Sequence, residues 1–138
     1  GFVVFARERI LFDDFKPGTL MGQHEEVFDA SLCEAWRKIF GLPDSAQAHP
    51  GEMPSLALAL AMRAYLSVVS PRPPGNVHAR QQFQMHALPE VGEVMRTTVR
   101  CAHKEIRRER RYVDIQVQAT GRDARALYSG EMSLIWAA

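Results

Sequence analysis

The chain has 138 residues, of which 46% are hydrophobic and 24% are charged. These values are typical of a globular domain and exclude a disordered or fibrous chain, and the length predicts a single α+β domain over residues 1–138. The 17 basic and 16 acidic side chains leave a net charge of +1, which excludes a general attraction of the whole molecule to nucleic acid or to an anionic membrane. Any binding of a polyanion must therefore be local.

The first part of the chain is predicted to be extended. Residues 2–12 and 20–28 are expected to be extended segments, and the segment between them contains Pro17-Gly18, which is typical of a turn. The apolar run at residues 2–6 is shorter than the core of a signal peptide and has no small-residue cleavage pattern after it. We therefore expect a cytoplasmic protein.

Two helices are predicted next. Asp29 or Ser31 caps the first helix, which ends at about Phe40. A proline-rich loop over residues 42–54 leads to the second helix, residues 55–69, which is apolar on nearly all sides, as expected of a helix in the core. This run is too short for a membrane span and contains Arg63, so no membrane association is expected. The apolar face of the first helix is formed by Leu32, Ala35, Trp36 and Ile39.

From Asn76 onward the hydrophobic period changes from 3.6 to 2. Val77, Ala79, Phe83 and Met85 alternate with polar residues, and so do the apolar residues between 112 and 119. Turns at residues 89–92, 107–111 and 121–123 separate these runs, which predicts an antiparallel meander of about four strands.

A helix that is apolar all round needs a strongly curled sheet to enclose it, which predicts the hot-dog fold. The unpaired sheet edges of such a domain favour a symmetric homodimer or a higher homo-oligomer. Cys33 and Cys101 have no CxxC or metal-ligand spacing, so we expect reduced, buried thiols.

Several segments carry a likeness to a known family. They are the helix at residues 30–40, the polar loop with Asp44 and His49, the apolar helix LALALAMRAYL, and the strands VHARQQFQMHALPEVGEVMRTTV and YSGEMSLIW. In this order they resemble the MaoC-like dehydratases, hot-dog relatives of the (R)-specific enoyl-CoA hydratases, over nearly the whole chain. The segment from Phe83 to Thr98 is similar to the family's F-x-x-P-x-x-x-G-D turn. The resemblance implies an acyl-CoA or acyl-carrier thioester as substrate, and no separate cofactor.

The family's catalytic signature is D-x-N-P-x-H. The segment from Asp44 to His49 keeps the spacing of the two ionisable residues but lacks the Asn and Pro, and His49-Pro50-Gly51 is also similar to a second His-Gly motif of the family. The resemblance implies that Asp44 and His49 transfer protons during hydration of an enoyl thioester, while the Gly51 amide holds the enolate oxygen. The alternative is a plain turn in which Asp44 caps a local amide and His49 is solvated.

Two other functions remain open for the same fold. A hot-dog thioesterase would use the same helix end as an oxyanion site, with Glu52 as the candidate base. A subunit without catalytic activity, which binds an acyl ligand or supports an active partner chain, is the other alternative.

Basic side chains dominate the run from Lys104 to Arg111. Arg107, Arg108 and Arg110 are candidates to bind the phosphates of an acyl-CoA by charge-assisted hydrogen bonds. A solvated hairpin with cross-strand Glu/Arg pairs is the simpler interpretation. Nucleic-acid binding is not expected, because no stacking aromatic motif accompanies the arginines.

The remaining histidines give weaker signals. His78 and His86 are expected on one side of the same strand, with Arg80 between them, where they either contact a ligand or face solvent. His24 and His103 lie in predicted strands and show no partner by sequence. No group of His, Cys and carboxylate residues has metal-ligand spacing, so no metal is expected.

Overall fold

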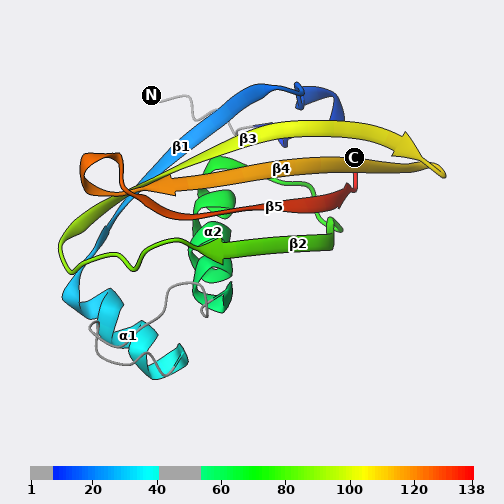
Figure 1. Cartoon of the computed structure of the whole chain (residues 1–138). Coiled ribbons are helices and arrows are strands. Elements are labelled where there is room, and N and C mark those ends of the chain that lie inside the picture. Colours follow the sequence, from blue (N-terminus) through cyan, green and yellow to red (C-terminus); the bar gives the residue numbers. More distant parts are fainter. Residues whose placement is uncertain (1–7, 41–53) are drawn as a thin grey trace, which may run out of the picture.

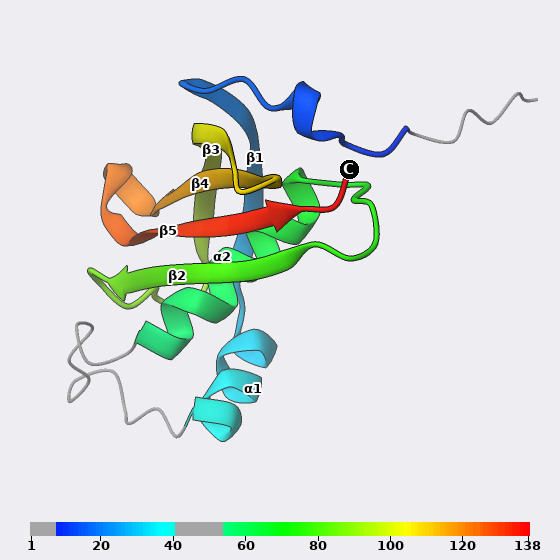
Figure 2. The same ribbon diagram turned by 90° about the vertical axis from the view of Figure 1, so that its right-hand side faces the viewer.

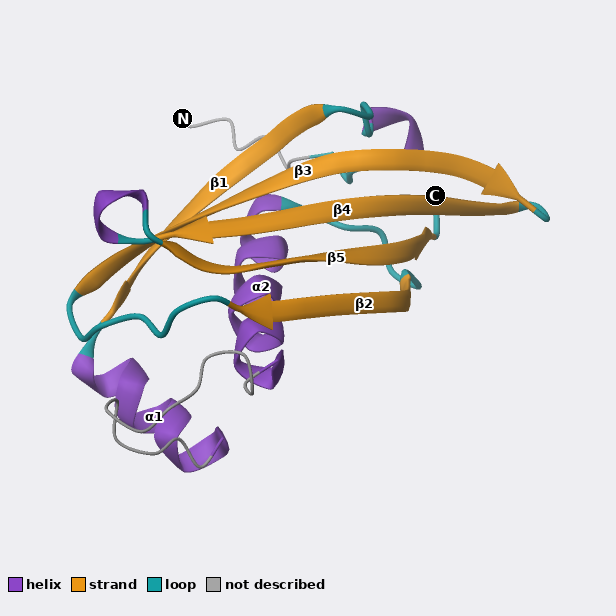
Figure 3. Cartoon of the chain, viewed as in Figure 1, coloured by secondary structure: helices purple, strands orange, loops and turns teal. Residues whose placement is uncertain are grey.

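A computed structural model describes residues 8–40 and 54–138. A single five-stranded antiparallel sheet, in the strand order β1-β3-β4-β5-β2, curls around helix α2, and helix α1 lies below one end of the sheet (Figure 1). Figure 3 shows the same elements by type. The elements are η1 (Phe12–Asp14), β1 (Thr19–Phe28), α1 (Ala30–Phe40), α2 (Pro54–Val68), β2 (Val77–Met85), β3 (Glu93–Arg107), β4 (Arg110–Thr120), η3 (Arg122–Ala124) and β5 (Ala126–Trp136).

Alternation of side chains builds the sheet. Along β4, Val113, Ile115, Val117 and Ala119 are buried while the residues between them are half-buried or exposed. This period of two places one apolar row on the concave side of the sheet, which faces α2. The predicted curled sheet with a helix against it is therefore confirmed.

Helix α2 crosses the concave side of the sheet (Figure 2). Its buried face packs against the strands. The opposite stripe is not enclosed: Ser55, Arg63 and Leu66 are exposed, and Leu66 keeps 44% of its surface accessible. The helix predicted to lie in the core is therefore buried along the side that the sheet covers and exposed along the opposite stripe. The buried residues of α2 are Leu56, Ala57, Leu60, Ala61, Ala64 and Tyr65.

The strands from 76 onward do not form a simple meander. Strands β3, β4 and β5 are successive neighbours, but β2 pairs with β5 along the far edge, and β1 pairs with β3. The segment between β2 and β3 crosses the end of the sheet, where Gly92 N–H donates to Phe28 O at 2.7 Å. This crossing lets β1 occupy the place beside β3 that a meander would give to β2.

A bulge changes the phase of β2. His78 pairs with Leu134 and Arg80 with Ser133, so Ala79 is an extra residue in the strand. His78 therefore faces α2, whereas Val77 faces outward and is 53% exposed. The predicted inward positions of Val77 and Ala79 are wrong for this reason.

The described residues before β1 include an extended residue, Leu11, as predicted, but they form no strand. Ile10 N–H donates to Pro71 O and Phe12 N–H donates to Ala138 O, both at 2.9 Å, and a short 3-10 turn follows. The indole of Trp136 donates to Ile10 O at 2.8 Å, and its ring meets Phe15 edge to face. This segment is thus tied to the end of β5 by single bonds and by packing instead of by a strand ladder.

The short helix α1 begins where predicted, because Asp29 Oδ1 accepts a hydrogen bond from Leu32 N–H at 2.8 Å. Leu32 packs against the core, whereas Ala35 of the expected apolar face is exposed. Within the described ranges, no helix is both long and apolar enough to cross a membrane.

Candidate functional site

The residues predicted to carry the chemistry are Asp44, His49 and Gly51, with Glu52 as the alternative base. All four lie at positions 41–53, outside the described residues. Gly51 is three positions before Pro54, where α2 begins. Of this candidate site, the described structure therefore contains the N-terminal end of α2 and the surface around that end.

A pocket of about 310 Å³ lies beside the first turns of α2. Ser55 and Leu58 line it from the helix, and Gln81, Gln82 and Phe83 line it from β2. The pocket combines apolar walls with a hydroxyl and two amide side chains, which is the usual composition of a small-molecule site. It also lies at the positive end of the helix dipole, which favours developing negative charge on a bound oxygen.

Two local features position the β2 wall of this pocket. After the bulge at Ala79 the phase of the strand has shifted, so that Phe83 faces the core and is buried. Gly130 on β5 lies directly opposite Phe83, and a β-carbon there would collide with the Phe83 ring and with the Gln82 carbonyl. Glycine at 130 is therefore needed for Phe83 to lie flat against β5.

The arginines predicted to bind phosphate lie on the hairpin between β3 and β4. Arg107 pairs with Arg110 across the last rung, and Arg108 and Glu109 form the turn, both with positive φ (52° and 64°). Arg107 also lies 4.3 Å above the Tyr112 ring and 3.6 Å from Glu105. The hairpin is thus confirmed, but this Glu/Arg contact lies within β3, between residues two positions apart, and is not the expected cross-strand pair.

This hairpin and the pocket lie at different places on the sheet. Phe83, Gly130 and Val117 form one cross-strand row. Val117 lies seven positions after Arg110 on β4, a separation of roughly 23 Å at the rise of a strand. Figure 1 shows the hairpin projecting beyond the ends of β5 and β2. Within one chain, the arginines therefore do not contact a group bound in the pocket.

The structure also brings together polar residues that the sequence analysis did not connect. On the concave side of β1, the Glu26 carboxylate is paired with both Nε and Nη2 of Arg63 on α2, and it lies 3.4 Å from Nε2 of His24. The side chains of His24 and Glu26 are only 23% and 15% exposed. The i, i+2 spacing on one strand face is the signal that predicts this His–Glu contact; the Arg63 contact spans 37 positions and has no local signal.

A second polar contact lies deeper in the core. The hydroxyls of Thr97 on β3 and Tyr128 on β5 are 2.6 Å apart and both residues are buried. Burial raises the pKa of Tyr128 to about 12, although the Thr97 hydrogen bond opposes that shift. The phenol is therefore neutral and acts as a hydrogen-bonding group of the core.

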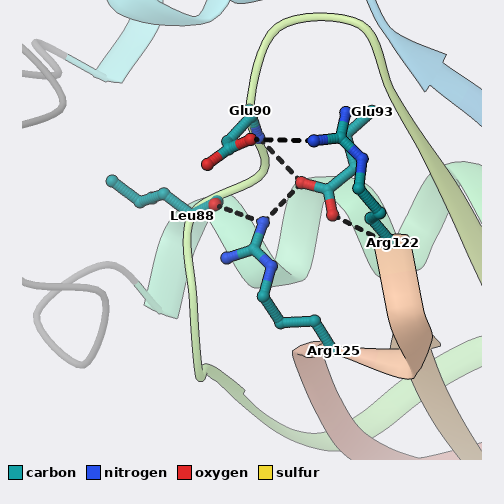
Figure 4. Close-up of polar contacts among 5 residues, drawn as sticks. All are labelled: Leu88, Glu90, Glu93, Arg122 and Arg125. Atoms are coloured by element: carbon teal, nitrogen blue, oxygen red, sulfur yellow. Dashed lines mark hydrogen bonds and ion pairs between the residues drawn. The ribbon is translucent and has the colours of Figure 1, made fainter.

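Glu93 is the most enclosed charged residue of the described chain, with a side chain 1% exposed. Figure 4 shows its polar contacts. Its carboxylate accepts hydrogen bonds from the backbone N–H groups of Glu90 at 2.9 Å and Arg122 at 2.8 Å, and from the Arg125 guanidinium. Arg125 also donates to Leu88 O at 3.2 Å. These bonds join the β2–β3 connection to the β4–β5 turn.

Glu93 has a structural role. Burial on its own would raise the pKa of this carboxyl, but the two backbone hydrogen bonds and the Arg125 guanidinium outweigh burial and lower it. A carboxylate with a lowered pKa and both oxygens occupied is a poor general base. Glu93 therefore holds the two loops at this end of the sheet together, and the family-like turn that ends at Gly92-Glu93 has this role.

The other singled-out residues are not gathered into one site. His78 meets the Tyr65 ring of α2, and burial, together with the charge of Arg72, lowers its pKa. His86 lies on the opposite, convex side, where Nε2 is 2.7 Å from Ser129 Oγ. The predicted shared face of these two histidines is wrong, because the bulge at Ala79 lies between them. Cys101 is a buried free thiol, and burial raises its pKa.

His103 completes the set of histidines. Its Nε2 lies 3.8 Å from Glu105 on the exposed side of β3. Both side chains are largely solvated, so this is a surface contact with little effect on stability. The carboxylate partner of His24, by contrast, is mostly buried and forms two hydrogen bonds with Arg63.

Neither the protein-family models nor the curated proteins that were compared with this sequence gave a match. Solved structures did. A MaoC-like dehydratase from Rhodospirillum rubrum superposes with a TM-score of 0.74 at 13% identity, covering 92% of this chain and 97% of that one. The unliganded R-hydratase PhaJ1 from Pseudomonas aeruginosa gives a TM-score of 0.71 at 15% identity, over 93% and 86% of the two chains.

A third similar structure is described by the name of its fold. A protein of Mycobacterium tuberculosis with a double hotdog fold gives a TM-score of 0.64 at 16% identity, covering 94% of this chain and 45% of that one. At these identities the likeness shows the fold and not the activity. The hot-dog fold predicted from the sequence is confirmed.

Proposed function

We propose that this protein hydrates an enoyl thioester, or catalyses the reverse dehydration. One observation carries the proposal: a mixed polar and apolar pocket lies beside the first turns of α2, immediately after the loop that contains Asp44 and His49. The similarity of the fold to a MaoC-like dehydratase and an R-hydratase supports this reaction class.

The proposed reaction uses three groups. Asp44 and His49 act as the acid/base pair: one removes a proton from water as its oxygen bonds to the β-carbon, and a proton is then delivered to the α-carbon. The Gly51 amide, near the N-terminus of α2, donates to the thioester oxygen while it carries negative charge. The acyl chain would enter between Leu58 and Phe83, which form the apolar walls of the pocket.

The anionic handle of the thioester, from CoA or from a carrier, would dock on Arg107, Arg108 and Arg110. These guanidiniums are exposed at the hairpin tip. Their separation from the pocket, roughly 23 Å along β4, requires a long flexible arm between the handle and the acyl group. Such an arm is common to CoA and to carrier proteins.

We also propose a homodimer formed along β2. The other edge strand, β1, is protected against pairing by an inward-facing charged residue, Glu26, and by a bulge between Leu20 and Gly22. From Gln81 to Met85 β2 runs regularly, and its exposed residues there, Gln81, Gln82 and Gln84, are uncharged. An uncharged, regular edge is the one suited to pairing with a second copy.

Hydration of crotonyl-CoA, followed by loss of absorbance of the conjugated thioester, tests the proposed activity. Asp44→Ala and His49→Ala should each lower kcat by at least about a hundredfold, because each removes an acid/base group, while the circular dichroism spectrum is unchanged. Full activity in both variants would remove the assignment. Release of free thiol without loss of the double bond would instead identify a thioesterase.

A further inference from the structure

The hairpin arm, defined as residues 104–111, concentrates charge in an otherwise nearly neutral protein. It holds five basic and two acidic side chains, whereas the whole chain has a net charge of +1. The ladder between β3 and β4 continues without a break from the bulge near His103 to the last rung at Arg107–Arg110. The arm is therefore a regular hairpin that presents its charges at a fixed place, at the projecting end of the sheet (Figure 1).

Two of the five cations are already engaged. Lys104 Nζ donates to Phe12 O at 3.1 Å and lies 4.6 Å from the centre of the Phe12 ring. Arg107 contacts Tyr112 and Glu105. Arg108, Arg110 and Arg111 are exposed and form no side-chain hydrogen bond or ion pair with any residue in the described ranges. Three guanidiniums are thus free to bind a partner.

The arm also exposes a large apolar side chain. Ile106 is 67% accessible, and it pairs with Arg111 across the hairpin. Because side chains alternate along a strand, Ile106 and Arg111 lie on one face of the arm, and Arg110 with Arg107 lies on the other. The free guanidiniums therefore surround the tip instead of converging on a single point.

We infer that the arm docks an acidic carrier protein, which presents the thioester on a phosphopantetheine arm; this inference rests on the proposed function and names its handle. A nucleotide phosphate is bound best by donors that converge in a concave site. Guanidiniums on both faces and at the tip of a convex hairpin, around one exposed isoleucine, match an acidic protein surface with an apolar centre and a charged rim. A carrier seated there would reach the pocket by its flexible arm.

The test measures binding without turnover, so that a missing hydratase activity does not decide it. Fluorescence anisotropy would follow a labelled, unacylated holo acyl carrier protein as it binds the full chain. We expect Arg108→Gln/Arg110→Gln/Arg111→Gln to weaken binding at least about tenfold, and Ile106→Ser to weaken it about threefold. The control Arg80→Gln/Arg100→Gln removes two exposed arginines from the sheet and should change the affinity less than about twofold.

Four results would overturn the inference. They are no binding of the carrier to the wild-type chain, equal losses in the arm and control variants, an unchanged affinity in the arm variants, or an arm-dependent affinity for CoA or for anionic vesicles that exceeds that for the carrier. If the carrier binds as expected but crotonyl-thioesters are not hydrated, the proposed function fails while the docking surface stands.

Discussion

Glu93→Gln is the substitution for which the structure gives the most detailed prediction of a loss of stability. The carboxylate has one oxygen facing the Arg122 N–H and the other facing the Glu90 N–H and Arg125. Glutamine offers one oxygen and one NH₂ group, so in either orientation an NH₂ group points at a buried N–H donor. The charge that pairs with Arg125 is also lost.

The expected cost follows from these contacts. Hydrogen bonds to a charged group contribute about 1.5–3 kcal/mol, and removal of one partner of a buried pair costs about 3–5 kcal/mol. Since Arg125 is partly exposed, we expect the lower value, about 3 kcal/mol, and a fall of about 10 °C in Tm. Urea unfolding followed by circular dichroism measures the free energy of unfolding directly.

A matched control separates burial from charge. Glu25→Gln removes an equivalent carboxylate from an exposed pair, in which Arg96 Nε lies 3.0 Å from Glu25 Oε1, and should cost less than about 0.5 kcal/mol. If Glu93→Gln costs no more than this control, the reasoning about the loop junction is wrong.

The same carboxyl sets a dependence on pH. Its pKa in the folded chain is below the ordinary value of 4.5, so the folded state favours the ionised form. The stabilisation is complete well above pH 4.5 and is lost as the pH falls toward the lower folded-state pKa. Wild type should therefore lose stability over this acidic range, and Glu93→Gln should lose less.

Three further predictions concern the core and the sheet edge. Gly130→Ala should cost about 1–3 kcal/mol by overpacking, since the new methyl group would meet Phe83 Cα at 2.7 Å; wild-type stability in thermal unfolding would contradict this. Tyr128→Phe should cost about 1–2 kcal/mol by leaving the Thr97 hydroxyl unpaired. Because burial raises the pKa of Tyr128 to about 12, the stabilisation by this phenol should be complete below pH 10 and lost as the pH rises toward 12. A series of unfolding measurements at alkaline pH tests this. Gln82→Lys/Gln84→Lys adds like charges along β2 and should convert a dimer to monomer in light scattering after gel filtration; a dimer that persists would place the interface elsewhere.

Periodicity predicted the fold well where side chains alternate without interruption. The run from Val113 to Ala119 was assigned correctly because its alternation continues for more than four strand residues. The helix from 55 to 69 was assigned correctly because its apolar pattern continues for more than two helical turns. The assignment of β2 beside β3 was wrong, since alternation defines the faces of a strand and not its neighbours. Pairing depends on the path of the connection, here the crossing at Gly92.

The candidate site was less predictable for a related reason. The loop from Asp44 to Gly51 was selected by its spacing, and it lies outside the described residues. Glu93, by contrast, is not distinguished in the sequence from the other charged residues near predicted turns. Its burial arises from Arg122 and Arg125, which are about thirty positions away and come close only after β4 has returned along β3.

Bulges explain both the wrong face of β2 and the shape of the sheet. Four strands carry one extra residue each: Met21 in β1, Ala79 in β2, Ala102 in β3 and Leu127 in β5. Ala102 and Ala79 flank the same cross-strand row, in which Asp114 accepts a hydrogen bond from Ser133 at 2.5 Å. Extra residues aligned across a sheet increase its twist and bend along that line.

This bend has a consequence for the hairpin arm. Beyond Ala102 the phase of β3 is reversed, so Lys104 and Ile106 continue the concave face that Cys101 occupies before the bulge. If Ala102 were paired in the ladder, with no bulge, alternation would place Ile106 on the convex face and Arg107 on the concave one. Deleting Ala102 should therefore leave residues 103–107 opposite the same partners and on the same faces, because the extra residue is the one without a partner in β4, and the affinity for the carrier should be kept.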